Sequence, residues 1–304
     1  MATHYISTVT TSIVVLLASL IISVATTKET ISLDLDVDFL EFPLNLEYLE
    51  AEFFLFGATG KGLDAFAPEL TDGGPSPIGA KVAKIRDLTI KDIIFQFGLQ
   101  EVGHLRAIKS TVKGFPRPLL DLSKSSFAKV MDKAFGRPLH PPFDPYANDI
   151  NFLLASYLIP YVGLTGYVGA NPLLQTATAR QLVAGLLGVE SGQDAVIRTL
   201  LYERRALKVK PYGVTVGEFT DRISNLRNKL GNGGVKDIGL SNIDSGEVGN
   251  ILVGDESSLS YPRTPDEILR IVYGSGDESI PGGFYPKGAN GRIARILLHA
   301  NKSY

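Results

Sequence analysis

Glu101 and His104 lie three residues apart in a mostly apolar stretch of the chain, between Gly98 and Arg106. Residues three or four apart share one face of a helix, so this spacing places a carboxylate beside an imidazole. Both groups interrupt a face that the surrounding pattern predicts to be buried. A buried carboxylate without a partner costs on the order of several kcal/mol, so the sequence predicts either a metal ion or a polar network around this pair.

Two more glutamates occupy positions of the same kind. Glu47 shares an apolar helix face with Leu44, and Glu190 shares one with Ile197. Carboxylate and imidazole ligands favour hard or borderline divalent ions, and the chain has no Cys for softer chemistry. For one iron, manganese or other hard divalent ion, the predicted ligands are therefore Glu47, Glu101, His104 and Glu190.

Other polar residues are assigned to solvent. Glu50 and Glu52 are expected to be solvated charges on the helix of Glu47, and His140 lies among prolines that predict a surface loop. The alternative to a metal is a network in which His104 bridges the carboxylates. Three carboxylates would then face one cation, so at least one of them would have to be protonated.

Composition places the chain among ordinary folded proteins. It has 304 residues, 44% of them hydrophobic and 20% charged, with a net charge of −2. Lys and Arg number 30 against 32 Asp and Glu, so no nucleic-acid partner is expected. No nucleophile elbow or glycine-rich phosphate loop favours a hydrolase, and no residue is assigned to catalysis. The partners that remain open are a metal ion and a second copy of the chain.

The amino terminus predicts a signal peptide over residues 1–26. Its apolar run over 13–24 is shorter than the roughly 20 residues that span a bilayer, and small residues follow it. We therefore expect secretion. No membrane span is expected after cleavage.

Four long helices are predicted to position the ligands. The first begins near residue 38, the second covers about 77–111, the third covers 147–170 and the fourth runs from 171 to about 207. Pro160 is expected to kink the third helix, because an interior proline removes a backbone hydrogen bond.

The chain changes character after Arg205. A capped helix is predicted over 215–230, a short helix ends at Tyr273, and residues 288–298 form either a helix or a strand. The remainder reads as loops.

An E-x-x-H pair and inward carboxylates on neighbouring helices are typical of ferritin-like bundles. The segments 45–54, 100–104 and 161–167 resemble the ferritin-like domain of plant desiccation-related proteins. This resemblance implies an all-α fold with a ferritin-like four-helix bundle over 38–207. An additional helix and a loop-rich C-terminal extension over 208–304 are expected to pack on the bundle.

The resemblance also implies a di-iron site, which this chain matches only in part. That site takes a Glu from the first and third helices and E-x-x-H from the second and fourth. Here the third-helix position is assigned to Pro160 and the last His position is Gln193, so two ligands are missing. Asp194 or Tyr157 are the candidates to compensate.

The function implied by the resemblance is a secreted, stress-protective and non-catalytic protein with a degenerate metal site. The destination it implies is the cell wall or apoplast, with the vacuole as second choice. The alternative is a metal-dependent oxidoreductase or iron-binding protein, with iron or manganese at the partial site. A third hypothesis is a binding module for a small plant molecule, with its pocket beside Pro160.

Overall fold

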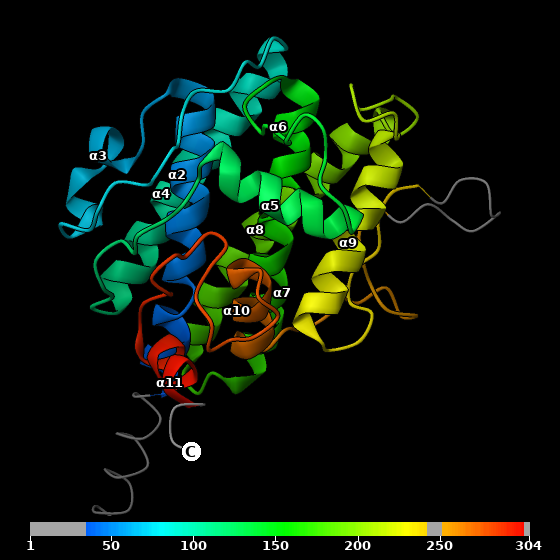
Figure 1. The fold of residues 1–304 in the computed structure, drawn as a ribbon. Coiled ribbons are helices and arrows are strands. Elements are labelled where there is room, and N and C mark those ends of the chain that lie inside the picture. Colours follow the sequence, from blue (N-terminus) through cyan, green and yellow to red (C-terminus); the bar gives the residue numbers. More distant parts are fainter. Residues whose placement is uncertain (1–34, 242–250, 301–304) are drawn as a thin grey trace, which may run out of the picture.

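The computed structural model describes residues 35–241 and 251–300, which fold into helices joined by loops (Figure 1). Only isolated bridges, and no strands, occur in these two ranges, which confirms the predicted all-α class. The predicted signal peptide lies outside the described residues. Four helices form the bundle: α2 (Leu44–Thr59), α4 (Leu88–Thr111), α7 (Pro160–Ala170) and α8 (Ala177–Glu203).

Shorter helices surround this bundle. They are α3 (Leu63–Phe66), α5 (Lys124–Phe135), α6 (Asp149–Ser156), α9 (Val216–Gly231), α10 (Pro265–Tyr273) and α11 (Arg292–Ala300), with 3-10 turns η1 (Pro68–Thr71) and η2 (Asn171–Leu173). α10 contacts α7 and α9, and α9 contacts α5, α6 and α8. α9 and α10 therefore lie against the bundle, and α11 packs on α10 (Figure 1).

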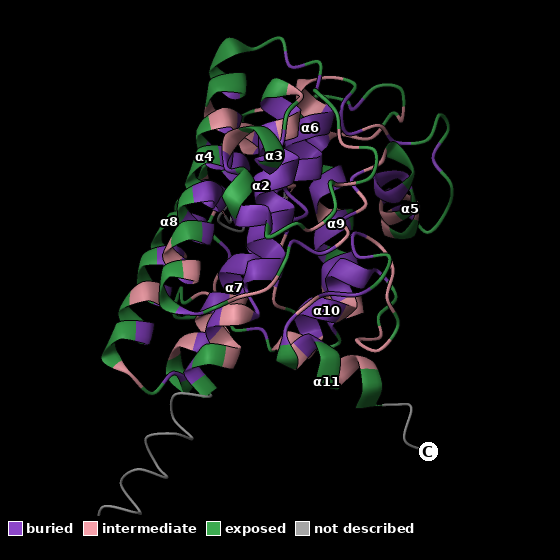
Figure 2. Cartoon of the chain, turned by 90° about the vertical axis from the view of Figure 1, so that its left-hand side faces the viewer, coloured by how far each residue is buried: buried purple, intermediate pink, exposed green. Residues whose placement is uncertain are grey.

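α2 is enclosed on every side, whereas α4 and α8 expose one face to solvent (Figure 2). α4 covers one side of α2, and the segment that contains Tyr285 and Asn290 covers another. There, the hydroxyl of Tyr285 donates to the carbonyl of Asn45 at 2.8 Å, and the backbone N–H of Asn290 donates to Asn45 Oδ1 at 2.8 Å. The prediction that Glu50 and Glu52 are solvated is wrong, since they are 1% and 0% exposed. Glu50 faces Gly163 of α7, and Glu52 pairs with the buried Arg117.

The second bundle helix begins at Leu88 and not near residue 77. Residues 77–87 are extended, and their backbone bonds reach other segments: Ile78 N–H donates to Leu120, and Ala83 N–H donates to Gly57. The helix starts where the side chain of Asp87 accepts from two backbone N–H groups of the first turn.

The third element is broken, and not kinked, at Pro160. α6 ends at Ser156, and Pro160 occupies the first turn of α7, where the missing N–H needs no partner. The fourth helix also starts later than predicted, because Thr176 is its N-cap and residues 171–173 form η2. α9 has the predicted capping box, and the last segment is the helix α11.

One helical stretch, Asp149–Leu173, is long and apolar enough to cross a membrane by composition. Within its most apolar window, 83% of the residues are buried inside the protein. This burial is what the core helices of a bundle require.

Candidate metal centre

The four predicted ligands meet in the core of the bundle. Nδ1 of His104 lies 2.9 Å from Glu47 Oε2, 3.2 Å from Glu101 Oε2 and 3.5 Å from Glu190 Oε1. One ligand atom from each residue lies within 4.8 Å of the others. α2, α4 and α8 contribute these side chains, and all four residues are buried.

The arrangement of these atoms fits a hard divalent ion. Neighbouring ligands that lie about 2.1 Å from an octahedral ion are about 3.0 Å apart, close to the separations around His104 Nδ1. In addition, Glu50 Oε2 and Glu190 Oε2 accept no hydrogen bond from the described residues. An unsatisfied buried acceptor costs about 1–3 kcal/mol, and a cation would remove that cost. Carboxylate and imidazole donors suit iron or manganese.

Glu50 lies beside this cluster, although the pattern of its helix predicts that it is solvated. It lies one turn after Glu47 on α2. If Gly163 carried a Cβ, that atom would lie 3.2 Å from Glu50 Oε1 and 3.6 Å from Glu190 Oε2. Both carboxylates therefore face the bare backbone of α7. The i, i+3 spacing of the two glutamates on α2 was the signal that could have revealed this.

α7 contributes a hydroxyl to the cluster, and no carboxylate. The position of this helix that faces the carboxylates is Gly163, one turn after Pro160, so the assignment of Pro160 to that position is wrong. Tyr167 lies four residues further on the same face, and its hydroxyl donates to Glu47 Oε1. This bond orients the Glu47 carboxylate toward His104.

Gln193 occupies the position expected for a second histidine. Its Nε2 donates to Glu101 Oε1 at 2.5 Å and to Gln100 Oε1 at 3.1 Å, while its own Oε1 has no partner among the described residues. The amide thus positions a ligand of the cluster. Neither proposed substitute replaces the lost histidine.

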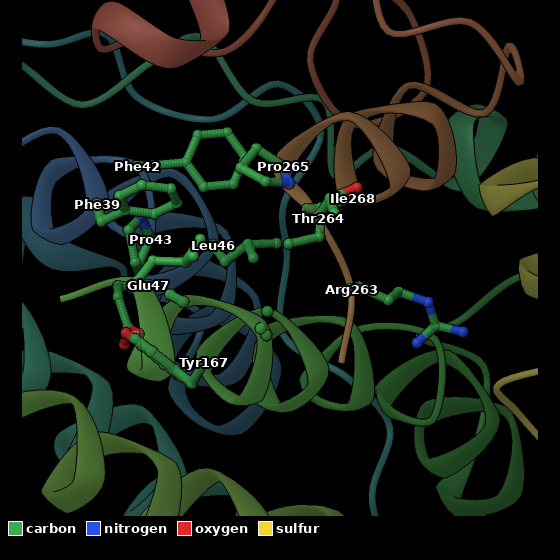
Figure 3. Close-up of a pocket in the computed structure, with 15 residues that line it drawn as sticks. Phe39, Phe42, Pro43, Leu46, Glu47, Tyr167, Arg263, Thr264, Pro265 and Ile268 are labelled. Atoms are coloured by element: carbon green, nitrogen blue, oxygen red, sulfur yellow. The ribbon is translucent and has the colours of Figure 1, made fainter. Parts of the chain in front are cut away.

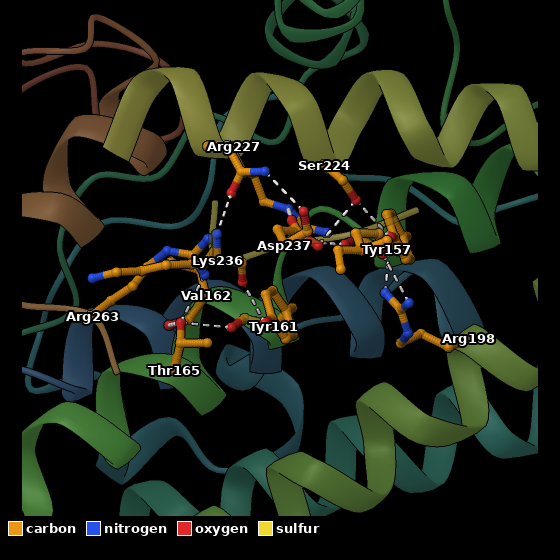
Figure 4. A network of polar contacts seen from close by, with 12 residues as sticks. Tyr157, Tyr161, Val162, Thr165, Arg198, Ser224, Arg227, Lys236, Asp237 and Arg263 are labelled. Atoms are coloured by element: carbon orange, nitrogen blue, oxygen red, sulfur yellow. Dashed lines mark hydrogen bonds and ion pairs between the residues drawn. The ribbon is translucent and has the colours of Figure 1, made fainter. Parts of the chain in front are cut away.

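Tyr157, one of those substitutes, belongs to a separate buried network (Figure 4). Its hydroxyl contacts Ser224 Oγ at 2.8 Å and accepts from Arg198 at 2.9 Å. Asp194, the other substitute, is also buried; burial raises its pKa to about 6, and the charges of Arg198 and Arg227 oppose that rise. Arg198 thus holds the Tyr157 hydroxyl, and neither Tyr157 nor Asp194 is among the residues grouped around His104 Nδ1.

Burial is the largest influence on the titration of the cluster. It raises the pKa of Glu50 and Glu101 well above the ordinary range, and the charges of neighbouring carboxylates add to this effect. It also raises the pKa of Glu190 to about 7, against the hydrogen bond of His104. Without a metal, protonated carboxyl groups would therefore surround a central ion pair.

The central pair is His104 with Glu47. Burial alone would lower the pKa of His104, but the charge of Glu47 and the bonds from three carboxylates raise it. Burial alone would raise the pKa of Glu47, but the charge and hydrogen bond of His104 outweigh burial and lower it. This is the metal-free network that the sequence analysis gave as the alternative.

An apolar pocket reaches the cluster at Glu47 and Tyr167 (Figure 3). It lies between the beginning of α2, α7 and α10, and Phe39 and Phe42 form part of its wall. Gly166 leaves the space open, because a Cβ there would lie 2.7 Å from Ile268 Cδ1. The pocket runs along the glycines of α7; Pro160, beside which a pocket was predicted, does not line it.

Comparison with known proteins agrees with this geometry. A sequence model of the ferritin-like domain matches residues 35–203, more than half of the chain. The protein belongs to the ferritin-like family. This ferritin-like protein is 60% identical over 267 residues to the desiccation-related protein PCC13-62 of Craterostigma plantagineum, covering 86% of this chain and 85% of that protein. The resemblance to plant desiccation-related proteins is confirmed.

A second relative carries a different name. The ferritin-like protein is 57% identical over 268 residues to the ferritin-like catalase Nec2 of Nesocodon mauritianus, covering 86% of each chain. No solved structure matches this chain. The buried cluster of glutamates and histidine is thus the part of the fold in which metal chemistry is to be sought.

Proposed function

We propose that this ferritin-like protein holds iron or manganese in its bundle core and removes hydrogen peroxide there by disproportionation. The observation that carries the proposal is the convergence of three carboxylates on Nδ1 of a buried histidine, beside buried oxygens that lack hydrogen bonds. The relative named a ferritin-like catalase supports the reaction, and the desiccation-related relative supports a stress-related role. The residues that would hold the metal are Glu47, Glu101, His104 and Glu190.

The reaction balances without a further reactant. One hydrogen peroxide takes up two electrons and two protons and becomes two water molecules, and a second gives up two electrons and two protons and becomes dioxygen. A redox-active metal, when bound, stores the electrons between these two half-reactions.

Two side chains of the protein would hold the ligand carboxylates in position. Tyr167 holds Glu47 through its hydroxyl, and Gln193 holds Glu101 through its amide. Such outer hydrogen bonds keep ligand carboxylates in position. The apolar pocket beside Glu47 suits a small neutral substrate such as hydrogen peroxide, because an ion would lose its hydration there.

Secretion is part of the same proposal and rests on the apolar run over 13–24. A secreted enzyme of this kind would protect the cell wall or apoplast from oxidation.

Protein loaded with manganese or iron is expected to release dioxygen from hydrogen peroxide, measured with an oxygen electrode. Glu101→Ala removes a carboxylate next to His104 and should lower the rate at least about 100-fold, together with the bound metal. The control is Glu69→Ala, since Glu69 is exposed and pairs only at the surface with Arg106.

A loaded protein that releases no dioxygen, or a Glu101→Ala protein that keeps the full rate, would overturn the proposed reaction. The second candidate is then the metal-free, non-catalytic protective role, which the network of His104 with Glu47 favours. Its test is the survival of a labile enzyme through drying, compared with the same mass of albumin.

A further inference from the structure

We propose that Glu50 is a metal ligand that replaces the missing third-helix carboxylate, so that the centre binds two divalent ions. This inference rests on the proposed metal site and extends it, because Glu50 is not one of the four residues around His104 Nδ1.

The position of Glu50 carries the first step. Glu50 lies three residues after Glu47 on α2, so both carboxylates enter the core from one helix. Glu50 Oε1 lies next to the place where a side chain of Gly163 would begin, at 3.2 Å from that Cβ. The side chain of a third-helix carboxylate would have to begin at the same Cβ position. Glu50 thus fills, from α2, the space that such a ligand would need.

The second step is the orientation of Glu190. Its Oε1 lies 3.5 Å from His104 Nδ1, whereas its Oε2 lies on the side of Gly163, 3.6 Å from that Cβ position. Glu50 Oε1 faces the same position. The two oxygens of Glu190 therefore face two places, one beside His104 and one beside Glu50, as a bridging carboxylate requires.

Unpaired atoms support a second ion. Within the described residues, Glu50 Oε2 and Glu190 Oε2 are buried and have no hydrogen-bond partner. These are hard oxygen donors, which suit manganese or iron. An ion beside His104 would leave Glu50 without a counter-charge.

The charge of the buried carboxylates also indicates two divalent ions. Four buried carboxylates carry four negative charges once they are deprotonated to bind metal, and a histidine that binds metal through a lone pair is neutral. The ion pairs that the described residues offer these carboxylates all come from His104. One divalent ion would leave two charges unbalanced in the core, whereas two ions balance all four. The carboxylates are those of Glu47, Glu50, Glu101 and Glu190.

The test is the number of Mn²⁺ ions bound per chain, measured by equilibrium dialysis and metal analysis, together with electron paramagnetic resonance of the loaded protein. The wild type is expected to bind two ions and to show the signal of a magnetically coupled pair. Glu50→Gln should weaken the second ion at least about 10-fold and leave the first bound, with the signal of a single ion.

A second variant displaces the Glu50 carboxylate without removing its charge. Gly163→Ala places a Cβ against Glu50 Oε1 and should also weaken the second ion. Its matched control is Gly185→Ala on α8, where a Cβ meets nothing within 4 Å and the exchange within a helix is the same. Thermal melting of each variant checks that it folds.

The outcomes separate the two proposals. One ion in the wild type, or two in Glu50→Gln, would overturn the role of Glu50 and leave the four-residue site intact. No bound ion in the wild type would overturn both. Two bound ions in a protein that releases no dioxygen would support Glu50 as a ligand and overturn only the proposed reaction.

Discussion

Protein freed of metal by a chelator is expected to become less stable as the pH rises from about 4.5 to about 7. Burial raises the pKa of Glu190 from 4.5 to about 7, and raises that of Glu50 and Glu101 well above 4.5. In this range the folded chain therefore binds more protons than the unfolded chain, and stability falls as pH rises. His104, whose pKa is raised by its carboxylates against burial, acts in the same direction above its unfolded pKa of about 6.5.

Glu47 is the exception. Its pKa is lowered in spite of burial, so its stabilising effect is lost only as the pH falls below about 4.5. Among these groups, the balance places the maximum stability of the metal-free protein near pH 4.5. For Glu190 alone the decrease toward pH 7 is on the order of 3 kcal/mol, because one pKa unit corresponds to about 1.4 kcal/mol.

Urea unfolding at pH 5, 6 and 7, with and without Mn²⁺, measures this effect. Metal binds to deprotonated ligands, so the difference between the loaded and the metal-free protein should widen with pH. An ion at 100 times its Kd stabilises the folded state by about 2.7 kcal/mol. For a chain of this size, whose unfolding entropy is about 0.6 kcal/mol/K, that corresponds to roughly 4–5 °C in Tm. Metal-free stability that rises from pH 5 to pH 7 would contradict the prediction.

Replacing Arg117 with alanine is expected to cost about 3–5 kcal/mol of unfolding free energy. Arg117 is 1% exposed and pairs with Glu52, which is 0% exposed. Its guanidinium also donates to Asp64 Oδ1 at 3.0 Å and to the carbonyl of Gly74 at 2.9 Å. Burial already raises the pKa of Glu52 against the charge of Arg117, so the variant leaves a buried carboxylate without its cation.

The measurement is urea unfolding of Arg117→Ala beside Arg106→Ala. Arg106 pairs with Glu69 at 3.2 Å, but both side chains are more than half exposed, so that variant should lose less than about 1 kcal/mol. Because Glu52 lies on the helix of Glu47 and Glu50, the variant also tests how firmly α2 holds the centre. A loss for Arg117→Ala as small as that of the surface variant would contradict the prediction.

Local spacing was sufficient to find the pair on α4, Glu47 on α2 and Glu190 on α8. It failed for Glu50 and Glu52, because amphipathic reasoning assumes that one helix face meets water. α2 has no such face, since residues as distant as Tyr285 cover it. Burial by a segment more than 200 residues away leaves no trace in the pattern of α2 itself.

The third helix shows a different limit. The resemblance to the di-iron pattern implied Pro160 as the ligand position of a third helix that was expected to run from residue 147 to residue 170. The chain leaves the helix after Ser156 and starts a new one at Pro160, and Gly163 is the residue that faces the carboxylates. The segment 77–87 was likewise predicted to be helical. It is extended, because its backbone hydrogen bonds reach Gly57 and Leu120, which are distant in sequence and leave no local pattern.

The contact between Glu50 and Gly163 also restricts how related sequences can diverge. A longer residue at 163 collides with Glu50, while a small residue at 50 beside Gly163 leaves a void where a carboxylate was. The two positions should therefore covary: relatives with an acidic residue at the site of Gly163 should have a small residue at the site of Glu50. Such a compensated exchange would move one carboxylate from one helix to its neighbour and conserve the total charge of the core.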